Sequence, residues 1–256
     1  MQLPIFSFII SQERGIYFDN IYLLTKIISG EDEVNKYEAL YLNRLLITQA
    51  PAISVGNAKK ELVHLASYAI QSLEASYAFF DKGDEKYFDK VEKYETAVNS
   101  IDEELTTYLI DISNELLSVY ENEILASVLD SVRDLERIGD LAVASATLSQ
   151  HIHNKGIEFS GTTKAELVDV YNRPHRIVLD SIRVVVDDGK VLAGQVILRH
   201  EELKKLEKLL RKIHTKRLNN GECTVQAGTN YVDLSHYTRI ADHTINLVEK
   251  VTEGVI

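Results

Sequence analysis

Apolar residues recur every three to four positions over most of the chain after residue 50, the spacing that places them on one face of an α-helix. In the first such stretch Leu62, Leu65, Ile70 and Leu73 keep this period, and Pro51 suits a first helical turn. The pattern predicts helices over residues 51–80, 85–117, 120–153, 163–187, 190–218 and 231–252. The sequence therefore predicts an all-α protein.

Short polar segments containing glycine separate the predicted helices. Asp81-Lys82-Gly83, Asn154-Lys155-Gly156 and Asn219-Asn220-Gly221 each follow a periodic stretch, and glycine suits the left-handed conformation that often follows a last helical turn. Pro174 lies inside the fourth predicted helix, where it removes one hydrogen bond, so we expect a kink there. Residues 222–227 are compatible with a locally extended chain.

Two short strings, Arg-Ile-Gly-Asp at 137–140 and Arg-Ile-Ala-Asp at 239–242, recur about 100 residues apart. A second pair, Asp81-Lys82-Gly83 and Asp187-Asp188-Gly189, recurs at nearly the same offset. Two landmarks in the same phase indicate a duplicated unit. We therefore predict two tandem antiparallel three-helix bundles, over residues 51–158 and 159–256, after a connecting or docking segment at residues 1–50.

Composition excludes several classes of function. The net charge of −11 argues against nucleic acid as a partner, because such binding depends on neutralising phosphates. The single Cys223 fits a reducing cytoplasm, and no run reaches the ~18 apolar residues of a membrane span. No Gly-rich phosphate loop, Ser-His-Asp order or nucleophile elbow occurs. We expect a cytoplasmic protein that is not an enzyme.

Acidic residues gather in the first repeated string. Glu136 and Asp140 are four residues apart, so they share a helix face with Cβ atoms ~6 Å apart. One interpretation is an exposed lattice of ion pairs with Arg137, of small energetic value. The other is a site for a hard cation such as Mg²⁺, Mn²⁺ or Fe. Because two carboxylates are too few, another helix would have to contribute, and Glu92 and Glu95 are the nearest candidates.

The remaining candidates are weaker. Glu61 and His64 form a Glu-x-x-His, which di-iron bundles use twice, but no second copy occurs here, so chance is favoured. His236 and His243 share a helix face beside Asp242 and are weak ligand candidates. The basic stretch at residues 204–217 fits a solvated helix face, with contact to anionic lipid as the alternative.

Three segments resemble known proteins. RDLERIGDLAV at 133–143 and YTRIADHTINLVE at 237–249 resemble the paired Glu/Asp-x-x-x-Asp signature of the PhoU family, and the likeness covers about 200 residues from Pro51 onward. Residues 40–74 are similar to the junction between the membrane domain and the cytoplasmic PhoU-like domain of bacterial sodium/phosphate cotransporters. The resemblance implies a module at the inner face of the membrane that regulates or accompanies sodium-dependent phosphate transport. A free-standing PhoU-type regulator of phosphate signalling is the alternative.

The resemblance also implies multinuclear binding of Fe, Zn, Mn or Mg ions through the signature carboxylates. Glu136 and Asp140 match the first signature, whereas in the second Asp242 matches and Thr238 replaces the acidic residue. With Glu95 from the neighbouring helix, the expected metal ligands are Glu136, Asp140, Glu95 and Asp242. The implied partner is a membrane phosphate transporter domain or a phosphate-signalling protein, and membrane-surface contact and a homo-oligomer are further expectations.

Overall fold

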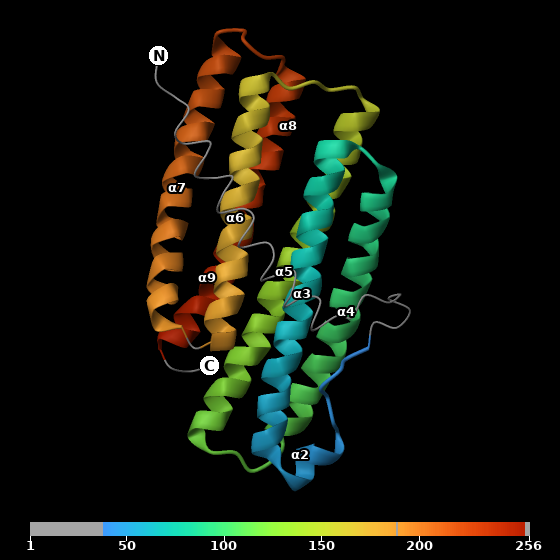
Figure 1. Cartoon of the computed structure of the whole chain (residues 1–256), viewed down its shortest axis with the longest axis vertical. Helices are drawn as coiled ribbons and strands as arrows, with labels where there is room; N and C mark the ends of the chain where they lie inside the picture. Colours follow the sequence, from blue (N-terminus) through green and yellow to red (C-terminus); the bar gives the residue numbers. More distant parts are fainter. Residues whose placement is uncertain (1–37, 188, 254–256) are drawn as a thin grey trace. The chain divides into compact units, whose positions relative to one another are not determined.

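The computed structural model describes residues 38–187 and 189–253, which belong to one compact unit (Figure 1). Helices contain most of these residues, and no strand occurs among them. The predicted fold class is therefore confirmed. The docking segment expected at residues 1–50 falls largely outside the described residues.

The first three-helix bundle consists of α3 (Pro51–Lys82), α4 (Glu85–Ser113) and α5 (Val119–Asn154). The short α2 (Leu45–Gln49) packs against α3 and α4 at one end of it. Gly83, with φ 65°, ends α3 as predicted. The α4 helix ends four residues before the predicted bound, because Ser118 and Glu121 form a capping box that starts α5.

The second bundle consists of α6 (Gly161–Asp187), α7 (Lys190–Asn219) and a third arm in three pieces. The pieces are α8 (Val225–Ser235), the 3₁₀ turn η1 (His236–Thr238) and α9 (Arg239–Thr252). Pro174 lies inside α6, which continues on both sides of it. The second bundle thus also has three helical segments in sequence, the last of them divided into three pieces.

Two predictions about that last arm were wrong. The helix expected over 231–252 is interrupted at η1, where Tyr237 is buried, its hydroxyl hydrogen-bonded with Ser76 of α3 and its ring edge against Tyr171 of α6. Packing of this one large side chain outweighs local helix propensity. Residues from Val225 onward are helical rather than extended, because Thr224 Oγ1 accepts a hydrogen bond from Ala227 N at 3.2 Å.

The two bundles lie side by side, with α3 against α6 and α5 against α9 (Figure 1). At this junction the Tyr77 ring of α3 stacks on the Tyr171 ring of α6, with centroids 3.7 Å apart. One continuous cluster of buried apolar side chains extends through both bundles. The contact between α5 and α9 brings the two helices that carry the repeated strings next to each other.

Candidate functional site

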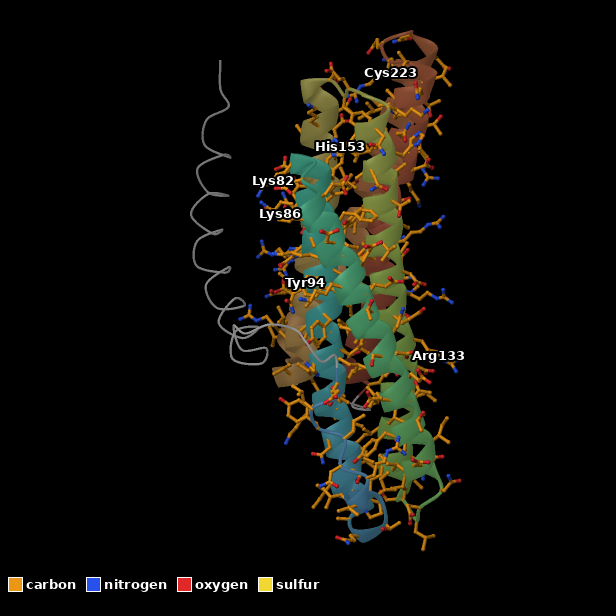
Figure 2. All side chains as sticks on the ribbon, turned by 90° about the vertical axis from the view of Figure 1, so that its right-hand side faces the viewer. Lys82, Lys86, Tyr94, Arg133, His153 and Cys223 are labelled. Carbon is orange, nitrogen blue, oxygen red and sulfur yellow. The ribbon has the colours of Figure 1, made fainter. Side chains whose placement is uncertain are left out.

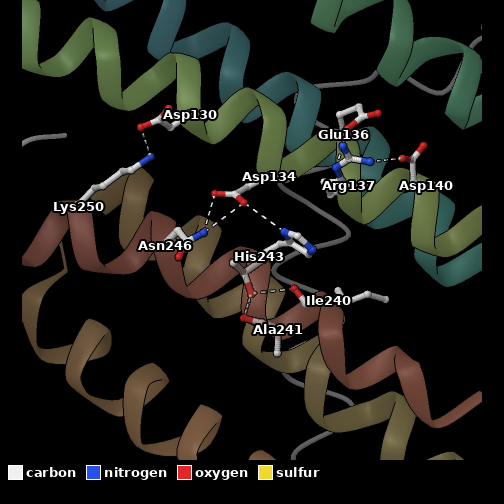
Figure 3. A network of polar contacts seen from close by, with 11 residues as sticks. Asp130, Asp134, Glu136, Arg137, Asp140, Ile240, Ala241, His243, Asn246 and Lys250 are labelled. Carbon is white, nitrogen blue, oxygen red and sulfur yellow. Dashed lines mark hydrogen bonds and ion pairs between the residues drawn. The ribbon is translucent and has the colours of Figure 1, made fainter. Parts of the chain in front are cut away.

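The first repeated string lies on α5, where Arg137 lies between Glu136 and Asp140 (Figure 3). Arg137 Nε is 3.7 Å from Glu136 Oε2, and Arg137 Nη1 donates to Asp140 Oδ2 at 3.3 Å. The side chains of Glu136 and Asp140 are 29% and 44% exposed. The pair is thus accessible from solvent, and one arginine only partly offsets its two charges.

Nearby negative charge acts on Glu136. Burial, and then the nearby charge of Asp140, raise the pKa of Glu136 above its usual value. Asp102 on α4 acts on Glu136 in the same sense, and burial raises the pKa of the Asp102 carboxyl as well. Two neighbouring carboxylates therefore disfavour the charged form of Glu136, and a cation would relieve this repulsion.

Asp102 was missed by the sequence reasoning, which named Glu95 on the same helix. Glu95 lies seven residues before Asp102, about 10 Å along α4. Which of the two carboxylates lies near Glu136 depends on the register of α4 against α5, and apolar periodicity does not determine that register. Within the described residues, no three His, Cys, Asp or Glu side chains form a group that could hold a metal ion. The structure therefore does not bring Glu136, Asp140, Glu95 and Asp242 into one site.

A small residue precedes the aspartate in both strings, and both copies are packed. A Cβ added to Gly139 would lie 3.4 Å from Val98 Cγ1 on α4, an ordinary contact. Ala241, the equivalent residue on α9, is fully buried. The small side chain allows a neighbouring helix to pack closely beside each aspartate.

The second string differs from the first because its aspartate is already paired. Asp242 Oδ1 is 2.7 Å from His200 Nε2, and Asp242 Oδ2 accepts from Lys204 Nζ at 2.5 Å, both from α7. Burial acts to raise the pKa of Asp242, but the hydrogen bonds from Lys204 and His200 outweigh it and hold this pKa below its usual value. Thr238, where the signature has an acidic residue, is 1% exposed. The aspartate of the second copy is therefore paired within the chain, although its side chain is 38% exposed.

His200 and Lys204 were also missed, although their i,i+4 spacing was visible in the sequence. The interpretation of residues 204–217 as a solvated helix face was wrong at both of its ends. Lys204 binds Asp242, and Arg217 makes two hydrogen bonds to Glu166 of α6 at 2.7 and 2.6 Å. Only the middle of the stretch follows the expectation, with Arg211 paired to Glu207 along the helix.

Another face of α5 holds the two repeats together (Figure 3). Asp134 accepts hydrogen bonds from Asn246 Nδ2 at 3.2 and 3.1 Å, and His243 Nδ1 is 3.2 Å from Asp134 Oδ1. Lys250 Nζ donates to Ser127 O at 3.2 Å and lies 3.7 Å from Asp130. His243, a ligand candidate from the sequence, therefore serves the interface. The side chain of His236 lies outside the described residues.

The Glu-x-x-His of α3 has a structural role. Glu61 and His64 are both buried, with Glu61 Oε1 2.7 Å from His64 Nδ1. Glu61 Oε2 also accepts hydrogen bonds from the backbone N–H groups of Leu40 and Tyr41, at 2.8 and 2.7 Å. This carboxylate fixes the chain before α2 onto α3, in agreement with the interpretation that the metal-motif match is accidental.

The fold and these contacts define a class: an all-α protein of two packed three-helix repeats, each with an aspartate after a small residue at a helix crossing. Residues 62–148, from α3 into α5, match the family model described as the PhoU domain. The likeness seen in the first repeat is thus supported. A likeness to the cytoplasmic domain of sodium/phosphate cotransporters stays a prediction.

Known proteins with similar sequences or structures agree with this class. The phosphate-specific transport system accessory protein PhoU homolog 1 of Thermotoga maritima is 27% identical over 128 residues, 50% of this chain and 54% of that protein. The chain thus spans about half the length of this curated relative.

Two crystal structures show the same fold. The phosphate transport system regulatory protein PhoU from Streptococcus pneumoniae superposes with a TM-score of 0.69 at 15% identity, over 78% of this chain and 94% of that one. PhoU from Pseudomonas aeruginosa gives 0.68 at 19% identity, over 80% and 99%. None of the helices in the described part of the chain has the length and apolar character needed to cross a membrane.

Proposed function

We propose that this protein is a PhoU-type accessory module that regulates or accompanies phosphate transport through contacts with other proteins. The observation that carries the proposal is the match of residues 62–148 to the PhoU domain. The curated relative is a phosphate-specific transport accessory protein, and the two structural neighbours share the helical fold. In a more specific form of the proposal, the phosphate transport is sodium-dependent and the protein acts at the inner face of the membrane.

Phosphate uptake in cells tests whether the transport concerned is sodium-dependent. Uptake of labelled phosphate is measured with and without sodium, in cells that have or lack this protein. We expect loss of the protein to change the sodium-dependent component alone. A change confined to the sodium-independent component would favour the alternative, a free-standing PhoU-type regulator of phosphate signalling. If neither component changed, both forms of the proposal would be contradicted.

We also propose that Glu136 and Asp140 bind a divalent or trivalent metal ion. The support is chemical: both are accessible carboxylates, the pKa of Glu136 is raised, and the charge of Asp102 adds to the repulsion. Carboxylate oxygens suit hard cations. The ion would supply a fixed positive charge at the surface of α5, and its remaining ligands would come from water or from a partner.

Elemental analysis of protein prepared without chelators tests the metal proposal. We expect bound metal in the parent protein and its loss in Glu136→Ala with Asp140→Ala. The matched control is Glu85→Ala with Asp89→Ala, which removes an exposed pair of carboxylates at the same i,i+4 spacing from α4 and changes the net charge equally. Metal absent from the parent, or lost equally in both variants, would contradict the proposal.

A further inference from the structure

One end of the first bundle exposes large apolar side chains that the bundle itself does not cover. Of the twelve large apolar side chains exposed within the described residues, six lie at this end. They come from α2, from the start of α3, from the end of α4, from the α4–α5 turn and from the start of α5: Leu45, Ile53, Ile110, Leu116, Val119 and Tyr120. We call this set the apolar tip.

The elements that carry the apolar tip lie together in space. Arg44, just before α2, pairs with Asp111 near the end of α4 at 3.0 Å, and Tyr108 Oη donates to Asn43 O at 3.3 Å. Both views show α2 and the α4–α5 turn at the same end of the bundle (Figures 1 and 2). The turn itself is the most prominent part, since Leu116 is 99% and Val119 is 78% exposed.

Exposed apolar side chains that gather at one end of a bundle can gain free energy by binding. A capping box at Ser118 and Glu121 fixes the end of the α4–α5 turn by two hydrogen bonds, and the exposed side chains flank it. Burying an exposed Leu or Val is worth about 1.5–3 kcal/mol for each side chain. A cluster of such residues around an ordered turn is typical of an interaction site.

The charges around the apolar tip restrict its occupant. Residues 105–123 contain four acidic residues, Asp111, Glu115, Glu121 and Glu123, and no Lys or Arg, while Arg44 beside α2 pairs with Asp111. An anionic lipid surface would be repelled. A second copy is disfavoured too, because a two-fold interface would place the same acidic patch opposite itself. A protein segment that surrounds apolar side chains with Lys and Arg is complementary.

We infer that the apolar tip is a docking surface for a cationic, apolar protein segment of the kind found in cytoplasmic loops of membrane proteins, which are enriched in Lys and Arg. The inference rests on the proposed function for the choice of a membrane protein as the source of that segment. The chemistry of the surface is inferred from its own residues and does not depend on the proposed function. Contact with a transporter would then use the end of the first bundle, away from the repeated carboxylates of α5.

Peptide binding to the full chain tests the chemistry. The probes are two labelled 14-residue peptides with the same Leu positions, one with Lys and one with Glu at the alternate positions, measured by fluorescence anisotropy. We expect the Lys peptide to bind at least about tenfold more tightly than the Glu peptide, about 1.4 kcal/mol. We expect Leu116→Ser with Val119→Ser to weaken its binding by about tenfold.

Two control pairs locate the effect. Leu209→Ser with Val225→Ser removes two equally apolar exposed side chains from the second bundle and is expected to leave binding unchanged. Glu115→Lys with Glu123→Lys should weaken binding more than Glu201→Lys with Glu202→Lys, which changes the net charge equally on α7. If the tip and control pairs have equal effects, or if the two peptides bind equally, the inference is overturned.

A second set of binding experiments distinguishes failure of this inference from failure of the proposed function. Peptides that cover the cytoplasmic loops of the phosphate-transport membrane protein of the same cell are tested with the same variants. If one loop binds and depends on Leu116 and Val119, both conclusions are supported. If the Lys peptide depends on the tip and no loop binds, the docking surface stands and the proposed source fails. Dimerisation, or binding to phosphatidylglycerol vesicles, that depends on Leu116 would overturn the inference.

Discussion

The two repeated strings share a small residue before the aspartate but differ in their electrostatics, and also in backbone setting, since the first lies in the middle of α5 and the second begins α9 after η1. On α5, Glu136 and Asp140 face solvent with one arginine between them, and the pKa of Glu136 is raised. On α9, Asp242 is held by Lys204 and His200, and its pKa is lowered. Both strings thus keep a small residue in the packing, while the first exposes negative charge that one arginine only partly offsets and the second neutralises its own.

The substitution with the largest expected effect places an acidic residue at position 238 of the second string, where the signature has one. Thr238 is buried at the end of η1. We expect Thr238→Glu to lower the free energy of unfolding by about 2–4 kcal/mol, because a carboxylate would be placed where water is excluded. Denaturant unfolding measures the change. The control is Thr147→Glu at an exposed position of α5, where we expect a change within about 0.5 kcal/mol.

Equal effects of these two substitutions would mean that residue 238 can turn to solvent. The second string would then be capable of the same chemistry as the first, and the contrast between the repeats would fail.

The next test removes the lysine side chain that pairs with Asp242. In Lys204→Met we expect the pKa of Asp242 to rise, because its main charged hydrogen-bond donor is lost. In the parent protein the pKa of Asp242 is lowered, so folding gains stability above the unfolded value of about 4 and loses it as pH falls. The variant should lose less stability on acidification. Carboxyl NMR titration measures the pKa directly.

The matched control for that substitution is Lys208→Met, an exposed lysine one turn further along α7. We expect it to leave the Asp242 titration unchanged. A similar shift in both variants would attribute the lowered pKa to the general basic character of α7 rather than to one ion pair.

The sequence predicted the fold well because its strongest signals are local. Apolar periodicity and the polar breaks at Gly83, Gly156 and Gly221 determine helix type and bounds, and all three glycines have the positive φ that such breaks need. The division of the last arm was missed because its cause is distant: Tyr237 is buried against α3 and α6. No local pattern contains that contact.

The site was predicted only in part, for a related reason. Glu136 and Asp140 were found because both lie on one helix at i,i+4 spacing. Asp102 and Lys204 were missed as partners because their roles depend on how α4 meets α5 and how α7 meets α9. Such registers are set by side-chain packing between helices, so the sequence of one helix does not give them.

The smallest test concerns the exposed pair itself. The pKa of Glu136 is raised, so its ionisation costs folding stability, and stability should fall slightly as pH rises above about 4.5. Glu136→Gln keeps the shape and removes the charge. In metal-free protein at pH 7 we expect it to stabilise the fold by about 0.3 kcal/mol, the scale of a like-charge i,i+4 pair. The difference from the parent should vanish near pH 4.

Denaturant unfolding of both proteins across this pH range measures the difference. With a divalent metal added in excess, the order should reverse, because an ion bound to Glu136 and Asp140 stabilises only the parent. A parent protein that is more stable than Glu136→Gln without metal at pH 7 would mean that Arg137 already neutralises the pair. The first string would then resemble the second, and the motive for placing a metal there would be lost.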